Sequence, residues 1–173
     1  MAATMLVQEK NGAGETATNK TAGTVRHKNA DNATVDTANP LIKPASGQEY
    51  SYQKWLRLNV SGTFTQVSNL KVYTDGANGL GTGVKLWWIT AAAYSTPVIP
   101  NESLDPPQHA STNMTNAFSY TSAAPLSLGA GPFDNTALPK DIGSYLISVM
   151  EVETTAAQGI TPGETITFAW DEI

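Results

Sequence analysis

The feature that most constrains this chain is the alternation of apolar and polar side chains at every second position. The clearest runs are residues 55–60, 84–89 and 165–170. Successive side chains of a strand point to opposite faces, so a period of two gives one apolar and one polar face. No segment of similar length has the 3.6-residue period of an amphipathic helix. The chain is therefore expected to be all-β, with helix below about 10% of its residues.

Composition narrows this expectation to an antiparallel β-sandwich, Ig-like or jelly-roll-like. Thr, Ala, Gly, Ser and Asn supply 82 of the 173 residues, and charged residues make up only 14%. Thr favours strands, whereas Gly, Asn and Ser favour turns. Short strands joined by turns rich in Gly and Pro are typical of a sandwich, here with about seven to nine strands. The length fits a single compact domain.

The inward-facing positions of the expected strands form the predicted core. They are Leu56, Leu58, Leu70, Val72, Val84, Leu86, Trp88, Leu146, Ile166 and Phe168. A weaker strand is expected at residues 117–121. The glycine-rich residues 75–83 join two expected strands and are interpreted as a hairpin or a bulged turn.

The two ends of the chain differ in character. Residues 1–24 are predicted to form an extended N-terminal arm, because residues 11–24 contain no large apolar side chain and cannot bury much surface. Residues 25–173 are then the sandwich domain, and residues 25–28 would be a short, charged edge strand. Residues 95–113 hold four prolines and are expected to form a long loop.

Charge and cysteine content exclude several classes of protein. Net charge is −5 with only ten Lys and Arg residues, so the basic stripe of a nucleic-acid-binding protein is missing. The chain contains no Cys, which excludes disulfides and thiolate chemistry. Apolar stretches are too short for a transmembrane helix, and the first residues do not resemble a signal peptide. We expect a protein made in a cytoplasm, with no membrane partner.

Catalytic motifs are weak. The two histidines, His27 and His109, are not accompanied by a nucleophile motif. Glu151 and Glu153 lie two apart on an expected strand and therefore share a face, as a glycosidase pair would. The alternation around them indicates a solvated strand end instead, so no catalytic residue is assigned.

Metal binding is also weakly indicated. Asp75 and Asn78 offer oxygen ligands for Ca²⁺, but the regular series of acidic ligands is absent. An Asp-Gly turn accounts for the same residues. We expect no metal and no cofactor.

Six residues are candidates for contacts with a partner, because they are exposed aromatics, lie in a charged segment or belong to the Pro-rich loop. They are Trp87, Tyr73, Arg26, His27, Pro106 and Pro107. Trp87 and Tyr73 lie on strand faces opposite the predicted core. Such aromatics either stack on sugars or pack under an arm, a second sheet or a neighbouring subunit, and the second reading is favoured.

Five phrases, taken in order, carry a resemblance to a known family. They are VRHKNADN (25–32), YQKWLRL (52–58), Phe64 with VSNLKVYTDG (67–76), GTGV (81–84) and TTAAQGITPGETITFAWDE (154–172). Together they resemble virion structural proteins of tailed bacteriophages, which are β-sandwich proteins attached to the capsid or, less often, to the tail. The resemblance spans roughly residues 24–172 and carries no catalytic signature.

The resemblance implies a non-enzymatic capsid decoration, or cement, protein that bridges and stabilises capsid subunits. Its partners would be the major capsid protein and neighbouring copies of itself, in a homo-oligomeric arrangement on the virion, after synthesis in the bacterial host. The N-terminal arm or the Pro-rich loop would reach a neighbour, and deleting residues 1–20 should leave a folded sandwich. A tail- or baseplate-associated protein and a carbohydrate-binding, receptor-binding module are the alternatives.

Overall fold

The computed structural model describes residues 2–100, 108–109 and 112–173. Strands make up 45% of the described residues, and the only helical element among them is the 3₁₀ turn η1 (Ala117–Ser119). The expected all-β, antiparallel sandwich is confirmed. The described residues form thirteen strands rather than seven to nine, because short strands of two to four residues occupy segments interpreted as loops.

The larger sheet contains seven antiparallel strands in the order β2-β1-β4-β12-β6-β9, with β3 paired to β12. They are β1 (Ala3–Asn11), β2 (Thr16–Asn19), β3 (Gln48–Tyr50), β4 (Lys54–Gly62), β6 (Val84–Ala91), β9 (Thr115–Asn116) and β12 (Lys140–Glu153). The long strand β12 pairs with β4 on one side and β6 on the other, and therefore lies at the centre.

The smaller sheet has β5 at its centre, with β13 on one side and β10 and β11 on the other. Its strands are β5 (Gln66–Tyr73), β10 (Leu126–Gly129), β11 (Phe133–Asp134) and β13 (Thr167–Glu172). A separate pair, β7 (Gln108–His109) and β8 (Thr112–Asn113), makes a third small sheet.

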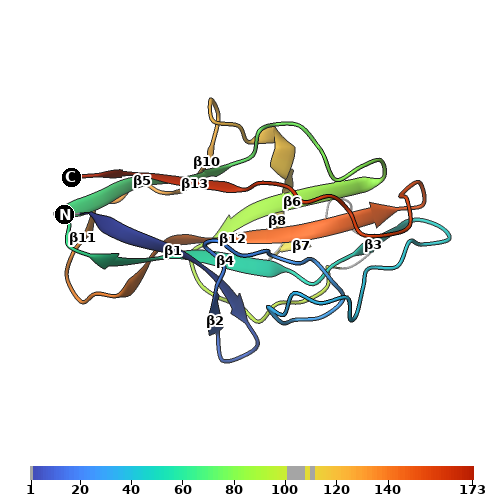
Figure 1. Ribbon diagram of the computed structural model, residues 1–173, viewed down its shortest axis with the longest axis horizontal. Coiled ribbons are helices and arrows are strands. Elements are labelled where there is room, and N and C mark those ends of the chain that lie inside the picture. The colour runs from blue at the N-terminus through green and yellow to red at the C-terminus, as the bar shows by residue number, and fades with distance from the viewer. Residues whose placement is uncertain (1, 101–107, 110–111) are drawn as a thin grey trace.

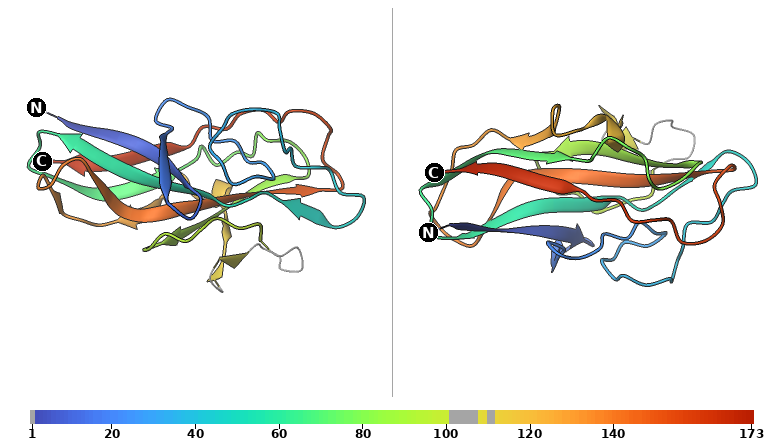
Figure 2. Two further views of the ribbon diagram at one scale, coloured as in Figure 1. Left: turned by 90° about the horizontal axis from the view of Figure 1, so that it is seen from below. Right: turned by 45° about the horizontal axis from the view of Figure 1, so that its top comes forward.

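The two main sheets face each other and form the sandwich (Figures 1 and 2). The smaller sheet covers the half of the large sheet that lies near the chain termini, which are both at the same end of the molecule. Over the other half, the second layer consists of two irregular segments. We call residues 20–47 the N-terminal coil and residues 154–166 the C-terminal coil.

Most of the predicted core is confirmed. Eight of the ten predicted positions are at most 4% exposed, namely Leu56, Leu58, Leu70, Val72, Val84, Leu86, Trp88 and Leu146. Ile166 and Phe168 are only partly buried against this core. Full burial was therefore wrong for these two residues, and the cavity described below gives the reason.

The two sheets come close together at Gly143, in the bulge where β12 shifts register against β4. Its φ is +71°, and a Cβ atom there would lie 2.7 Å from both the Leu128 carbonyl oxygen and Leu70 Cδ1. Only glycine fits this left-handed conformation and this spacing.

The prediction of an extended N-terminal arm at residues 1–24 is wrong, because β1 and β2 of this segment belong to the large sheet. Residues 3–10 pair continuously with β4, and residues 8–11 pair with β2. Met5 is 8% exposed and belongs to the core, so the apolar residues before position 8 anchor this strand. The prediction gave weight to the polar residues 11–24, whose side chains do not need burial in a hairpin on the sheet edge.

Three local predictions also fail. Residues 75–83 do not form a hairpin, because they connect β5 in the small sheet to β6 in the large one. Alternation identifies strands but does not say to which sheet each belongs. Residues 117–119 form η1 instead of a strand, with the Asn116 side chain accepting a bond from the Phe118 N–H. Residues 25–28 run through the N-terminal coil without strand pairing.

The predicted Pro-rich loop at residues 95–113 is described only in part, since residues 101–107 and 110–111 lie outside the described residues. In its first part, the Gln53 N–H donates to the Val98 carbonyl oxygen. Residues 108–109 and 112–113 form the pair β7–β8.

Candidate functional site

A cavity of about 790 Å³ lies between the large sheet and the two coils. Its floor is the inner face of the large sheet, where alternation places the apolar side chains. The floor residues are Leu56, Leu58, Val84, Leu86, Met150 and Val152. Phe168 and Trp170 of β13, and Ile166 directly before this strand, also line the cavity. They remain partly exposed because they face this open space rather than a packed layer.

The coils leave the cavity open because they have few large apolar side chains to fill it. In the N-terminal coil, residues 20–34 contain Val25 as the only large aliphatic side chain. Ile42 from the N-terminal coil and Ile160 from the C-terminal coil line the cavity but are 70% and 74% exposed. The rim of the cavity is therefore apolar on both sides.

Buried lysines hold the N-terminal coil in place. Lys54 on the inner face of β4 is 0% exposed and donates to the Asn32 carbonyl oxygen at 2.7 Å. Lys20 donates to the carbonyl oxygens of Ala33 and Thr24 at 2.6 and 3.0 Å. These bonds replace the apolar packing that the coil lacks.

The buried anion that balances these lysines is Glu9 of β1. Its carboxylate lies 3.2 Å from Lys54 Nζ and 3.6 Å from Lys20 Nζ, and the Glu9 side chain is 0% exposed. Burial lowers the pKa of Lys54, and the Glu9 carboxylate opposes this shift. The ion pair is thus a structural tie between the sheet edge, the sheet centre and the coil.

His27 lies beside this tie and is neutral. Its Nε2 is 2.9 Å from Ser148 Oγ, which also accepts a bond from Trp88 Nε1 at 3.2 Å. Burial and the neighbouring Lys54 charge lower the pKa of His27 to about 3. The residue therefore packs as an uncharged ring at physiological pH.

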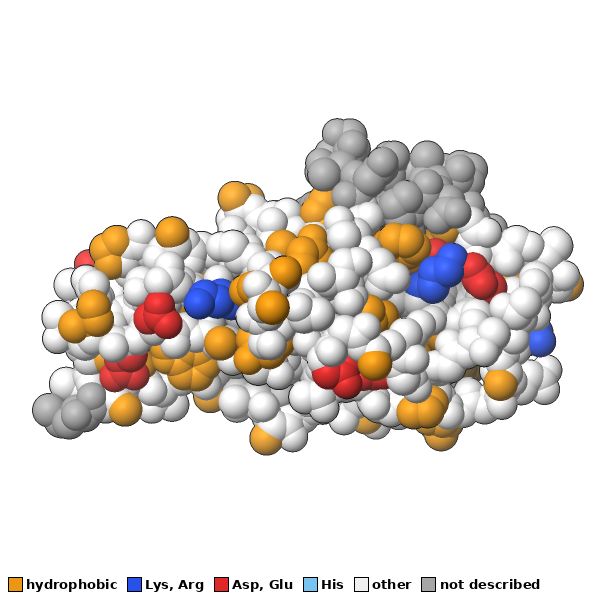
Figure 3. Space-filling model, turned by 90° about the horizontal axis from the view of Figure 1, so that it is seen from above, with side chains coloured by type: hydrophobic (Ala, Val, Ile, Leu, Met, Phe, Trp, Pro, Cys, Tyr) orange, Lys and Arg blue, Asp and Glu red, His pale blue; other side chains and the backbone are white. Residues whose placement is uncertain are grey.

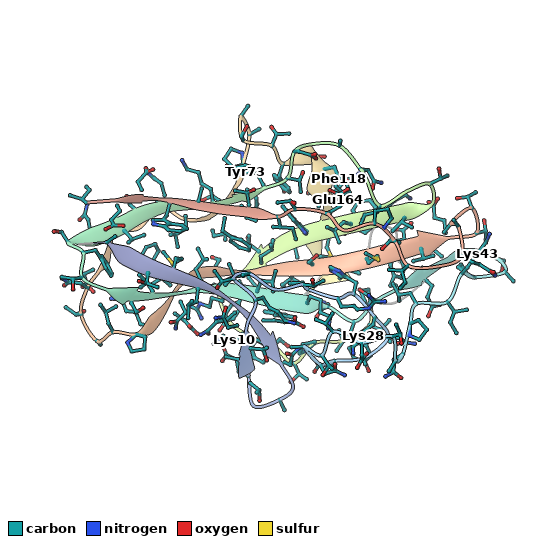
Figure 4. The ribbon with its side chains drawn as sticks, in the orientation of Figure 1. Lys10, Lys28, Lys43, Tyr73, Phe118 and Glu164 are labelled. Carbon is teal, nitrogen blue, oxygen red and sulfur yellow. The ribbon has the colours of Figure 1, made fainter. Side chains whose placement is uncertain are left out.

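The charged side chains that line the cavity are mostly cationic. Four of them are basic, namely Lys20, Arg26, Lys28 and Lys43, and two are acidic, namely Asp36 and Glu164. Lys28 pairs with Asp36 at 2.9 Å. Within the described residues, Arg26 and Lys43 make no ion pair or side-chain hydrogen bond. Figure 4 shows Lys28 and Lys43 on the N-terminal coil, with Glu164 on the opposite side.

The structure does not bring the predicted partner-binding residues together. Arg26 and His27 line the cavity. Trp87 lies on the outer face of the large sheet, and Tyr73 lies on the outer face of the small sheet (Figure 4). Pro106 and Pro107 lie outside the described residues. Trp87 and Tyr73 therefore cannot form one sugar-stacking platform.

The outer face of the large sheet has a small apolar cluster of its own. Its buried members are Tyr50, Trp55, Met114, Tyr145, Ile147 and Val149. Tyr94, from the segment after β6, packs on Trp55 with ring centroids 5.3 Å apart and donates to the Gly12 carbonyl oxygen. Trp87 packs at the border of this cluster and is half-buried.

Glu151 and Glu153 share the outer face of β12, as expected, but Glu151 is not part of a solvated strand end. It is 1% exposed and accepts a 2.7 Å bond from Trp87 Nε1. Lys85 pairs with both carboxylates. The alternation missed this burial because the cluster on the outer face is built from residues distant in sequence.

The residues considered for Ca²⁺ bind their own backbone. Asp75 Oδ1 accepts the Ala77 N–H, and Asn78 Oδ1 accepts the Leu80 N–H. In the part of the chain that the structure describes, no group of three or more His, Cys, Asp or Glu residues is placed to hold a metal ion. The same part contains no helix long and apolar enough to cross a membrane.

The sequence predicted two of the cavity residues, Arg26 and His27, but not the cavity. Its floor was predicted as core, and no local signal indicates that a coil rather than a strand covers that floor. No family model, curated protein or solved structure significantly matches the chain.

Proposed function

We propose that this protein is a non-enzymatic structural component of a tailed-bacteriophage virion, a decoration protein that bridges and stabilises capsid subunits. The observation that carries the proposal is the position of the family-like phrases in the fold. Residues 52–58 overlap β4, residues 67–76 overlap β5, and residues 154–172 include β13. The resemblance therefore lies in strands of both sheets and in the C-terminal coil.

The surface suits a protein that assembles with others in many copies. Figure 3 shows a face made mostly of small polar side chains and backbone, with few charged groups and scattered apolar ones. Many weak contacts repeated by the symmetry of a shell give high avidity. The net charge of −5 would keep free copies apart before assembly.

With residues 3–11 built into the sheet, an N-terminal arm cannot be the bridging element, and we assign the contact to the outer face of the large sheet around Trp87. The Trp87 ring is half-buried, and its Nε1 is held by the buried Glu151 carboxylate. Lys85 Nζ lies 5.9 Å from the ring centroid. A tryptophan held in one orientation loses little entropy on binding, and such residues dominate many interfaces.

The first test is the location of the protein. Mass spectrometry of purified particles, with heads and tails separated, should find the chain in the head fraction. Its presence in the tail fraction would favour the tail-associated alternative, and its absence from both fractions would overturn the proposal.

The second test measures binding of purified protein to capsids that lack it. Trp87→Phe keeps an aromatic ring but loses the indole N–H that donates to Glu151, and Trp87→Ala removes the whole contact. Trp87→Ala should weaken binding per site by about 2 kcal/mol or more, about thirtyfold in Kd. Tyr73→Ala is the matched control, because it removes an aromatic side chain from the outer face of the other sheet. If only Tyr73→Ala weakens binding, the contact face is the small sheet.

A further inference from the structure

We infer that the cavity between the large sheet and the two coils binds a free, single-chain anionic amphiphile, a molecule with an aliphatic chain and an acidic head group. The isolated protein is sufficient for this activity, which does not depend on the virion proposal.

The first argument is the size and lining of the cavity. A volume of about 790 Å³ lies within the usual range of small-molecule sites, roughly 300–1,000 Å³. Aliphatic side chains from β4, β6 and β12 form its floor, and Phe168 and Trp170 add aromatic surface. An aliphatic chain in the cavity would remove from water its own surface and that of the partly exposed Ile166, Phe168 and Trp170, worth about 25 cal/mol per Å² of apolar area.

The second argument is the apolar rim. Ile42 and Ile160 are more exposed than the other large apolar residues that the structure describes as exposed, and both line this cavity. Exposed apolar surface at the opening of a groove is typical of ligand-binding sites. They give an aliphatic chain a path to the floor.

The third argument is charge. The cavity lining has four basic and two acidic side chains, although the whole chain has a net charge of −5. Lys20 and Lys28 are used within the protein, by Glu9 and Asp36. Arg26 and Lys43 line the cavity from the N-terminal coil and are available for an acidic head group, which a guanidinium binds in a bidentate manner.

The recessed position of the cavity favours a single molecule over a membrane. The cavity has a sheet as its floor and a coil on each side, whereas a bilayer surface needs a projecting apolar face. We therefore assign the site to free amphiphile molecules and use vesicles to test the membrane alternative.

The experiment titrates the full chain with dodecanoate and with dodecyltrimethylammonium, both below their micelle concentrations. The two probes have the same aliphatic chain and opposite head charges. Calorimetry measures stoichiometry and Kd, and tryptophan fluorescence reports on Trp170 at the cavity wall. We expect saturable binding of one dodecanoate per chain and at least about tenfold weaker binding of the cation. Equal affinities, or binding without saturation, would overturn the inference.

Variants identify the cavity as the place of binding. The double variant Arg26→Gln, Lys43→Gln should weaken dodecanoate binding about tenfold and leave the cation unaffected or bound more tightly. Lys71→Gln removes a charge from the outer face of the small sheet and should have no effect. Ile166→Trp places a larger side chain in the cavity and should weaken both probes, with circular dichroism confirming that the sandwich is folded.

Sedimentation with anionic phosphatidylglycerol vesicles distinguishes the source of the ligand. We expect no co-sedimentation that competes with dodecanoate. Binding to vesicles without binding to dodecanoate would contradict a site for free amphiphiles and indicate a membrane-binding surface. A double variant that binds dodecanoate as tightly as the Lys71→Gln control would show that the cavity rim does not hold the head group.

Discussion

Glu9 and Lys54 form an ion pair that water does not reach, on the inner face of the large sheet. Such a pair gains little net stability over apolar side chains, but removing one partner leaves an uncompensated charge. Glu9→Gln leaves both Lys54 and Lys20 without their anion. We expect a loss of about 3–5 kcal/mol in the free energy of unfolding, measured by urea denaturation.

The control for this experiment is Glu15→Gln, because the Glu15 side chain is 35% exposed and lies 3.9 Å from Lys10. Glu15 also accepts a bond from the Tyr145 hydroxyl, which a Gln side-chain oxygen can accept as well. The Glu15→Gln substitution should lower the free energy of unfolding by at most about 1 kcal/mol. A Glu9→Gln variant as stable as Glu15→Gln would show that the buried lysines find other compensation.

His27 should make stability depend on pH. In the unfolded chain its pKa is about 6.5, whereas burial and Lys54 lower it to about 3 in the folded protein. As pH falls from 7.5 to 5, the unfolded state binds a proton that the folded state does not. The free energy of unfolding should therefore fall by up to about 2 kcal/mol over this range.

His27→Gln should remove this slope, whereas His109→Gln should keep it, because the chain contains only these two histidines. Denaturation at four or five pH values on each variant gives the comparison. If the slope remained in His27→Gln and disappeared in His109→Gln, His27 would not be the histidine with the lowered pKa.

At the scale of elements, the bulge in β12 lies where the two sheets come close together. Gly143 and Gly47 have the same φ of +71°, but only Gly143 has atoms near the position of a Cβ. Gly47→Ala should cost about 1–2 kcal/mol, the strain of a left-handed conformation. Gly143→Ala should cost about 1–3 kcal/mol more, because the Leu128 carbonyl oxygen must move. If urea denaturation gave equal losses for Gly47→Ala and Gly143→Ala, the two sheets would be able to move apart at Gly143 without a cost in stability.

The hairpin of β1 and β2 is an integral part of the large sheet. Deleting residues 1–20 would free the edge of β4 along its pairing from Lys10↔Trp55 to Ala3↔Gly62 and would remove Glu9. We expect a chain that no longer unfolds cooperatively, measured by thermal denaturation followed by circular dichroism. Deleting residues 1–2 alone should leave the transition almost unchanged. A cooperative transition in the longer deletion would restore the arm interpretation.

The elements differ in how well the sequence predicted them. The strands with alternating side chains, such as β4, β6 and β13, could be located because one face of each is apolar. The strand β1 was missed because only its first half is apolar, and its second half is anchored by Glu9 and Lys10 through charge. Sheet assignment failed at residues 75–83, where local turn chemistry is the same for a hairpin and for a crossing between sheets.

At the scale of the whole molecule, the fold class followed from composition and alternation, but the cavity did not. Its existence depends on which segment covers the inner face of the large sheet, and this is decided by contacts such as Lys54 with Asn32, which are distant in sequence. Arg26 and His27 were candidates for contacts because of their charge. Arg26 makes no ion pair or side-chain hydrogen bond among the described residues, and its charge helps to lower the pKa of Asp36. His27 is a neutral packing residue.

The closeness of the two chain ends has a practical consequence. Ala3 N–H donates to Glu172 Oε1 at 2.9 Å, and both termini lie at the end of the molecule covered by the small sheet. A short linker could therefore join them. New ends could be opened at Gly14, at the tip between β1 and β2, because this residue is exposed and has no atoms within 4 Å of a Cβ position. For fusion and display, cargo attached at either end of this chain would leave from the same end of the molecule, whereas cargo at the new ends would leave from the hairpin tip.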